Sequence, residues 1–487
     1  MTALRAVAGW TSPVLLASLA ARVFIGGAAA PLLVLIALVA PLLALLGPRA
    51  CIATTRTVGG FAVLGIGTVL WANVALIGDL ASLAGIDRRQ ALVAGLVVAL
   101  VPIVAVRGPR GWCAAAVPVG LAASALPLVV VASVTGVMPW SAWSRVASRA
   151  AFAFDERSEW VTEGRMLAQA TTLTFTEPHR VAAVTPGVYR VVEHDGSRAA
   201  VREWRLGSGD VLALRPGDRL VLERGVRVRF EPGKRVPGAA ASGAAWAEPA
   251  SPGAPAMTLQ FLGATMTFVG GAVALVSTPS STAGAAALGV PLTLLVFVLV
   301  PLCWGIYAMD AAPDLSLGAV LLTPLVQMPR AVDADHGAVL ATVVGLALVA
   351  LFLATLDALH RRVEQITAVG LGPSRVVWSV ICLGAFVAGL WPVDPWRVLL
   401  AGFGVLAAGS VAPALAAADR GATLIGGAVG AVAFLLSMLA GSRLAGDFAA
   451  VGEYPALVAA PLAWAAVHVA RRFERRASPP APGVAAS

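Results

Sequence analysis

The chain alternates long apolar runs with short polar connections over most of its 487 residues. Runs of about twenty apolar residues match a hydrocarbon core of roughly 30 Å at about 1.5 Å per helical residue. These runs predict a mainly α, polytopic membrane protein with about twelve transmembrane helices. The expected spans lie near residues 10–28, 31–47, 58–78, 90–106, 112–135, 258–277, 285–308, 337–359, 376–392, 396–416, 421–441 and 454–470.

One segment breaks this pattern, because its apolar residues recur at every second position. In the stretch "VRVRF", Val226, Val228 and Phe230 alternate with two arginines, which is typical of a strand with one buried face. Turn sequences at Asp195-Gly196 and at 215–218 separate further alternating runs. We expect five to seven short antiparallel strands forming a small all-β extracytoplasmic domain, a barrel or a sandwich, inserted after the fifth helix.

These patterns divide the chain into six parts. Before the β domain, Trp140, Trp143, Val146 and Ala150 share one helical face, which predicts an amphipathic helix at the membrane interface. After it comes a segment rich in Pro, Ala and Gly, which we expect to be a flexible tether. The predicted parts are 1–135 (five spans), 136–170 (interfacial helix), 171–236 (β domain), 237–257 (tether), 258–470 (seven spans) and 471–487 (cytoplasmic tail).

Composition supports a membrane class and changes how the charge is interpreted. Hydrophobic residues make up 59% of the chain, charged residues 13%, and the net charge is +9. In a soluble protein such a charge would indicate nucleic acid. Here the basic residues are scattered through short loops, so membrane threading explains them, and we expect the lipid bilayer and no nucleic acid as a partner.

Arginine placement predicts the orientation. With twelve spans, one side collects the basic loops and the opposite side the acidic ones. We therefore predict a multi-pass protein of the inner (plasma) membrane with both termini in the cytoplasm and the β domain outside. The basic loops contain Arg49, Arg56, Arg107, Arg110, Arg361, Arg362, Arg471, Arg472, Arg475 and Arg476; the acidic loops contain Asp310, Asp314, Asp333, Asp335, Asp447 and Glu453.

Three local features stay open at this stage. The apolar segment 315–326 is too short to span and either lies at the outer interface or dips in and returns; a crossing there would invert half of the topology. Arg22 is the one charge well inside a span, which snorkelling, a break between two half-helices or a function would each explain. Gly426 and Gly430 have GxxxG spacing, for which packing within the chain is the simplest interpretation.

The sequence gives little evidence for a metal or cofactor site. The four cysteines form no CxxC pair, and the β domain has no HxH pair, so we predict no metal and no cofactor. His194 precedes the Asp195-Gly196 turn, where a solvated histidine is expected. His336 and His468 fall at opposite ends of their spans, which disfavours paired haem ligands.

Two sets of residues are candidates for function. In the outer loops, Asp310, Asp314, Asp333, Asp335 and His336 are the titratable residues that an enzyme acting on lipid-linked glycans would need.

The second set lies in the cytoplasmic stretch "HRRVEQITAVGLGPSRVVW", 360–378, where Val363, Ile366 and Val369 share a helical face before Gly370, Gly372 and Pro373 end the helix. It resembles the coupling helix of ABC-transporter permeases, which implies docking to an ATPase subunit; a plain basic loop is the alternative. The implied docking residues are Arg361, Arg362, Glu364, Ile366, Val369 and Arg375. Permeases of lipopolysaccharide export also carry an outer β domain, although five spans before the domain and seven after it depart from their usual six.

Three hypotheses for function follow. The first is a permease-like or export-complex component that is not itself a catalyst, whose β domain docks substrate or an extracytoplasmic partner. No P-loop motif occurs in the chain, so energy from nucleotide would come from a cytoplasmic ATPase or another membrane subunit. The alternatives are a structural or assembly subunit of a larger membrane complex and a membrane enzyme acting on lipid-linked glycans.

Overall fold

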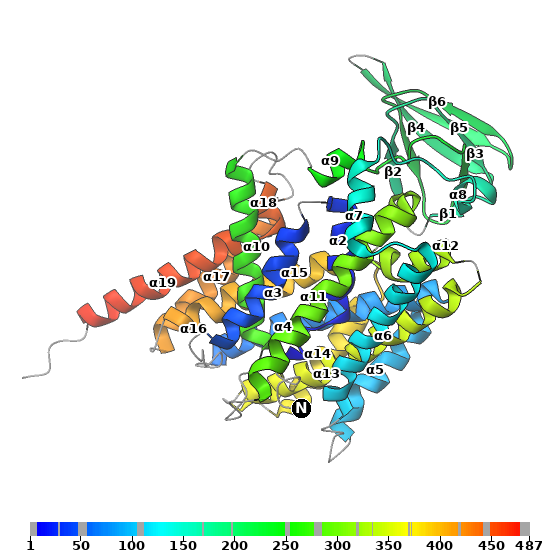
Figure 1. Ribbon diagram of the computed structural model, residues 1–487. Coiled ribbons are helices and arrows are strands. Elements are labelled where there is room, and N and C mark those ends of the chain that lie inside the picture. The colour runs from blue at the N-terminus through cyan, green and yellow to red at the C-terminus, as the bar shows by residue number, and fades with distance from the viewer. Residues whose placement is uncertain are drawn as a thin grey trace, which may run out of the picture.

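The structure is a computed structural model that joins a helix bundle to a small β-rich part at one end of it (Figure 1). It describes residues 7–27, 30–46, 56–104, 112–167, 170–195, 198–248, 254–276, 285–317, 321–333, 335–368, 371, 373–416, 420–441 and 449–477. We call residues 153–236 the β unit, because a bridge between Ala153 and Arg235 closes it.

Each of the twelve predicted spans contains a helix, and seven of these helices are long and apolar enough to cross a membrane. Three more are apolar but short. By length and composition, the described helices are therefore compatible with a multi-pass integral membrane protein, while the number twelve stays a prediction. The seven are α4 (Arg56–Leu83), α6 (Trp112–Thr135), α10 (Ala254–Leu275), α11 (Ala285–Ala311), α13 (Gly337–Thr367), α17 (Arg420–Gly441) and the continuous run of α15 (Pro395–Val405), η4 (Leu406–Val411) and α16 (Ala412–Ala416). The short ones are α2 (Pro13–Gly26), α3 (Ala30–Leu46) and α14 (Ser374–Ala388).

The other helices connect or flank these. Two lie within predicted spans, and the rest sit at the end of the bundle nearest the β unit or within that unit (Figure 1). They are α5 (Arg88–Val104), α7 (Pro139–Ser148), α8 (Glu159–Thr162), α9 (Gly243–Ala247), η2 (Pro313–Ser316), η3 (Thr323–Gln327), α12 (Met328–Val332), α18 (Ala449–Glu453) and α19 (Ala456–Ala477).

Contacts between helix ends place these ends in two layers, one near the β unit and one on the opposite side of the bundle. Near the β unit, Gly27 approaches Trp246 of α9, and Arg88 donates to the Gly389 carbonyl. In the opposite layer, Arg362 donates to the carbonyl of Ala274 at the end of α10. Arg471 does the same to Ala416 at the end of α16. The described arginines of the predicted basic loops thus lie opposite the β unit, whereas Arg49, Arg107 and Arg110 fall outside the described residues.

The described residues of the segment 315–326 contribute to two short helical turns at one end of the bundle, η2 and η3. Residues 311 and 337, on either side of it, both lie in the layer of the β unit, and η3 within it packs against α2, α11 and α13. Leu315, Leu322 and Leu325 are buried in the bundle core. Of the alternatives left open, this burial favours a segment that dips in and returns, while the number of spans stays a prediction.

Two predicted helices differ from their expected bounds. The interfacial helix α7 ends at Ser148 rather than near 170, because Phe154, Trp160 and Leu167 enter the core of the β unit. Its buried side is formed by Ala142 and Val146, whereas Trp140 is 70% exposed. The second difference is at 360–367, where α13 simply continues, so no separate amphipathic helix lies there.

The β unit contains two four-stranded antiparallel sheets that share one apolar core. Their orders are β1-β8-β3-β6 and β2-β7-β4-β5. Sequence alternation predicted strands β4 to β8 and β2, but it missed β1 and β3. The strands are β1 (Arg165–Met166), β2 (Thr171–Thr174), β3 (His179–Ala183), β4 (Gly187–Asp195), β5 (Arg198–Leu206), β6 (Val211–Leu214), β7 (Arg219–Leu222) and β8 (Arg227–Phe230).

Glycines let neighbouring helices approach closely. A Cβ added at Gly430 of α17 would lie 2.4 Å from the Ala408 carbonyl oxygen and 2.8 Å from Ala463 Cβ of α19. At Gly426 it would meet Val467, also on α19, at 2.2 Å. The GxxxG spacing therefore serves packing within the chain, as α17 and α19 lying side by side in Figure 1 also show.

We predict that Gly430→Ala lowers the free energy of unfolding in detergent by about 1–3 kcal/mol, because the methyl group overpacks the α17–α19 contact. The matched control is Gly384→Ala on an exposed face of α14, where an added Cβ meets nothing within 4 Å. Thermal unfolding followed by circular dichroism measures both. Equal midpoints for the two variants would contradict the role assigned to this contact.

We also predict a pH-dependent loss of stability in the β unit. His179 is buried between Phe175 and Phe230, and burial lowers its pKa, partly opposed by Glu177. As the pH falls below about 6.5, His179 takes up a proton in the unfolded chain before it does so in the folded one, because its pKa is lower in the folded state. The stability that the neutral, buried His179 allows above this pH is therefore lost as the pH falls through its folded pKa. Amide exchange at β3, corrected for its intrinsic pH dependence, should rise at pH 5 relative to pH 7.5. His179→Leu should remove this difference and His336→Asn, at an exposed site, should keep it.

Candidate functional site in the interior of the helix bundle

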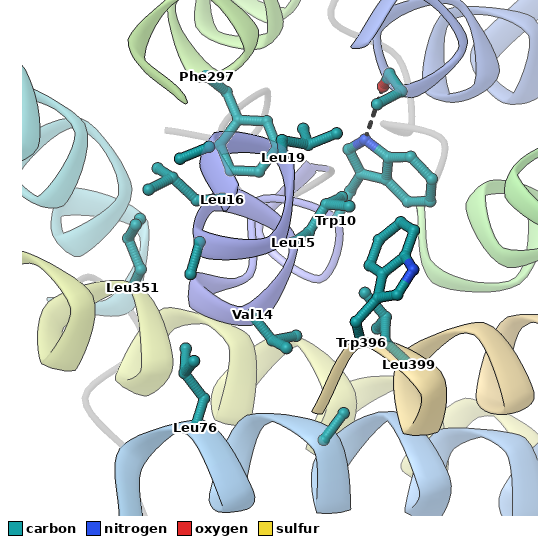
Figure 2. Packing of buried hydrophobic residues seen from close by; sticks show 14 of the residues in the cluster. Trp10, Val14, Leu15, Leu16, Leu19, Leu76, Phe297, Leu351, Trp396 and Leu399 are labelled. Atoms are coloured by element: carbon teal, nitrogen blue, oxygen red, sulfur yellow. Dashed lines mark hydrogen bonds between the residues drawn. The ribbon is translucent and has the colours of Figure 1, made fainter. Parts of the chain in front are cut away.

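Helix α2 lies at the centre of the bundle and is surrounded by other helices. Figure 2 shows Leu15, Leu16 and Leu19 of α2 among side chains of α4, α11, α13 and α15. Eleven of its fourteen residues are buried. At 1.5 Å per residue it is about 21 Å long, shorter than a bilayer core of roughly 30 Å. The predicted first span, 10–28, is therefore a short interior helix.

The amino end of α2 is buried within the bundle, where no water can satisfy its free N–H groups. Pro13 occupies the first helical position, where its missing N–H costs nothing. The Leu15 amide donates to Ser12 Oγ at 3.4 Å and the Val14 amide to Asn73 Oδ1 of α4 at 3.5 Å. Asn73 in turn donates to the Val69 carbonyl at 2.8 Å. A side chain from a neighbouring helix thus completes the cap.

The turn before α2 is held by four helices. The Trp10 indole N–H donates to the Ala37 carbonyl of α3 at 3.1 Å. The same ring stacks on Phe403 of α15 at 5.3 Å and meets Phe268 of α10 edge-on at 5.9 Å. From α13, Thr355 donates to the Ala8 carbonyl at 3.4 Å. These contacts fix where α2 begins.

A second interruption lies next to the first. The run α15–η4–α16 contains a π-helical turn, Leu406–Val411, three residues after the Phe403 that stacks on Trp10. All six residues of this turn are buried, and Ser410 Oγ donates to the Leu406 carbonyl at 2.6 Å. Glycines on three neighbours, Gly65, Gly270 and Gly430, leave room for it. π-Helical turns occur frequently at functional sites.

Polar groups without a partner occur among the buried described residues around these interruptions. Ser18 Oγ on α2, Thr267 Oγ1 on α10 and Trp396 Nε1 on α15 have no hydrogen-bond partner there. An unpaired buried hydroxyl or indole N–H costs free energy. This interior is thus apolar with isolated polar groups.

Arg22 lies near the other end of α2, four residues before the helix ends. Its guanidinium is 5.2 Å from the centre of the Trp396 ring and 3.6 Å from Glu453 Oε1. The side chain is 42% exposed, which favours snorkelling toward the layer of the β unit over burial in the bundle centre. Its position in the sequence suggested a charge deeper inside the span than is observed.

Two of the predicted outer-loop residues attach α7 and the β unit to the bundle. Asp310, at the end of α11, has a side chain only 2% exposed, 3.1 Å from Arg149 Nη2 and 3.4 Å from Arg145 Nε. Asp314 Oδ2 accepts a hydrogen bond from Ser158 Oγ at 2.5 Å.

The same attachment includes a third polar contact and an apolar one. Arg165 of β1 donates to Gln327 of η3, and Leu317 belongs to the core of the β unit. Burial lowers the pKa of Arg165, while the negative charges of Glu159 and Asp314 act in the opposite direction. Asp310 and Asp314 are therefore best explained as structural residues of this junction.

The other outer-loop candidates form the start of α13. Asp333 Oδ1 accepts from the amides of Asp335 and His336 at 3.0 Å each, and its Oδ2 is 3.2 Å from His336 Nδ1. These hydrogen bonds from the His336 and Asp335 amides lower the pKa of Asp333. The structure thus separates the five candidates into a junction and a helix start, and does not gather them in one site.

The residues expected to dock a cytoplasmic ATPase are largely engaged within the chain. Ile366 is buried in the bundle core, Arg362 donates to the last carbonyls of α10, and Arg361 pairs with Asp357. Glu364 and Arg375 are exposed, and Val369 lies outside the described residues.

Comparisons with known proteins leave this site to be interpreted on its own geometry. No protein-family model matches the sequence, and no functionally curated protein matches it significantly. Within the described residues, no three His, Cys, Asp or Glu side chains gather to hold a metal ion.

Sequence reasoning missed the interior cap, although a signal was present. Thr11-Ser12-Pro13 is a helix-start sequence, serine at the N-cap followed by proline, and it lies inside the predicted first span. Asn73 is an amide inside the third predicted span, where polar side chains are costly and therefore informative. Nothing in the sequence shows that these two residues meet.

We predict that Asp310→Asn loosens α7 and its connection to the β unit, because two arginines lose their shared carboxylate. Amide exchange over 139–167 should become about tenfold faster, equivalent to about 1.4 kcal/mol, while exchange in α4 stays unchanged. Asp335→Asn, at an exposed position, is the control. Unchanged exchange in the Asp310 variant would show that the junction does not depend on this ion pair.

Proposed function

We propose that the chain is a permease-like component of a membrane transport or export complex, with the β unit as its docking module. The observation that carries this proposal is the pair of adjacent helix interruptions in the bundle centre, the start of α2 at Pro13 and the π-helical turn in α15–α16. Membrane proteins tolerate broken helices where the backbone is buried in protein or lines a path, and transporters commonly use them.

The chemistry of the interior supports a carrier that is driven by a partner. The start of α2 is surrounded mainly by aromatic rings, aliphatic side chains and a few hydroxyl or amide groups. Asp357, on the helix that contacts Ala8 and Gly9, is paired with Arg361 and so is not free to bind a coupling proton or sodium ion. The sequence also lacks a P-loop. We therefore assign energy supply to a cytoplasmic ATPase or another membrane subunit, with Glu364 and Arg375 as exposed residues for its docking.

The proposed location is the inner (plasma) membrane, with the β unit outside and both termini in the cytoplasm. The arginines opposite the β unit support this orientation. The tether assigned to 237–257 and the tail 471–487 belong to the same proposal, although α9 occupies part of the tether.

One alternative function has an observation in its favour. A structural or assembly subunit would need no moving parts, and the complete capping of α2 by Ser12 and Asn73 would suit it. An enzyme acting on lipid-linked glycans loses its support, since Asp310, Asp314 and Asp333 stabilise a junction and a helix start.

Thiol labelling separates the proposed function from the structural alternative. In a background with all four cysteines replaced by alanine, Ser18→Cys places a thiol on α2, fully buried in this structure. A permease must open this interior, so we expect a membrane-impermeant thiol reagent to modify it at least tenfold faster than Ser124→Cys, an equally buried serine on α6. Mass spectrometry of the intact protein measures the rates.

Equal and negligible labelling of the two thiols, with full labelling of exposed Ser144→Cys, would reject a moving interior. That result would favour the structural or assembly subunit.

A further inference from the structure

Strand β5 presents a free edge of nine residues on the surface of the β unit. It pairs along its whole length with β4 and with no other strand that the structure describes. The described residues from Ala200 to Arg205 are all exposed, and Leu206 is half-buried. At about 3.4 Å per residue the edge is about 30 Å long. The other edge strands, β1, β2 and β6, have two to four residues.

The backbone at this edge is able to accept another strand. In an antiparallel pair, every second residue directs its N–H and C=O away from its partner. With a two-residue connection between β4 and β5, those residues are Val201, Glu203 and Arg205. Long, accessible edges of this kind are templates for strand addition.

The side chains along the edge combine apolar and basic character. Val201 is 65% exposed and pairs with Val192, and Trp204 is 41% exposed and pairs with Tyr189. These two large apolar side chains lie on opposite faces of the sheet, because successive residues of a strand alternate, and a neighbouring strand would cover each from its own face.

The charge of the β domain indicates which kind of strand would bind at the β5 edge. Between 171 and 236, twelve basic residues outnumber eight acidic ones. Glu193, Glu203 and Glu231 pair with arginines, and Asp210 and Asp218 accept amide hydrogen bonds in turns. Arg205 on β5 and Arg219 on β7 have no acidic partner in the described structure. The added strand should therefore carry acidic residues.

Pairing with a second copy of the chain conflicts with the membrane. β4 begins beside β8, where Val184 and Thr185 bond to Arg227, next to the β1 strand that touches the bundle. The hairpin then leads away from that base for nine residues. Two copies of β5 paired antiparallel would point in opposite directions, so their helix bundles could not occupy the same membrane.

We propose that β5 binds an extended, acidic segment of a partner protein by strand addition. Apolar side chains of this segment cover Trp204 on one face of the sheet, and acidic ones face Arg205 on the other. The proposal rests on the part of the proposed function that gives the β unit a docking role.

The test uses the full-length protein in lipid nanodiscs and two labelled nine-residue peptides, one alternating valine with aspartate and one alternating valine with lysine. Fluorescence anisotropy should show binding of the aspartate peptide at least tenfold tighter than of the lysine peptide. Val201→Pro removes an edge N–H but no ladder bond to β4, and it should weaken aspartate-peptide binding at least tenfold while leaving the surface charge intact.

Arg205→Glu provides a second variant that keeps the strand backbone. It should weaken the aspartate peptide and strengthen the lysine peptide. Equal binding of both peptides, or full binding of the aspartate peptide by Val201→Pro, would overturn the proposal, since either outcome means general attraction to a basic surface. A dimer in light scattering that Val201→Pro dissociates would overturn it in favour of self-association. None of these outcomes affects the labelling of Ser18→Cys, so the two proposals can fail separately.

Discussion

The rest of the structure depends on one constraint, which is that a helix beginning inside a membrane protein must satisfy its first N–H groups without water. The start of α2 meets it with Ser12 from its own chain segment, Asn73 from α4 and a proline that has no N–H to satisfy. This arrangement is possible only because Trp10 is fixed by α3, α10 and α15. The position of α2, the capping of its first amides and the aromatic packing of Trp10 thus depend on one another.

The junction of the β unit follows a different physical rule. At the rim of the bundle, charged groups remain partly accessible to water, so ion pairs can form without the full cost of burial. Arg145 and Arg149 reach Asp310 from the surface, and only the carboxylate is fully buried. Because η3 touches Arg165 on one side and packs against α2, α11 and α13 on the other, the β unit and the central helix share a direct neighbour.

Periodicity in the sequence predicted the helices and most strands, because these depend on residues close together in the chain. Apolar runs gave a helix in each expected span, and period-two alternation with Asp195-Gly196 and Pro216-Gly217 gave most strands of the β unit. β3 begins directly after Pro178, a residue that usually ends a strand, so the sequence pattern did not reveal it. The interior cap was not predictable, since Val14 and Asn73 are 59 residues apart and no pattern links them. The same holds for Arg149 and Asp310, which are separated by 161 residues. Asp310 attracted attention as an outer acid, but its role depends on a partner that only the fold reveals.

The central place of α2 also constrains how the chain is made. The tryptophan just before this helix stacks on Phe403, which follows almost four hundred residues later in the chain. At about 5–20 residues per second, the two are synthesised roughly 20–80 s apart. During that interval the bundle has an unfilled centre, and Asn73 on α4 is among the first groups available to shield the exposed amides of α2. Biogenesis of this protein therefore requires that this short helix be protected from lipid until the neighbours that follow it in the chain arrive.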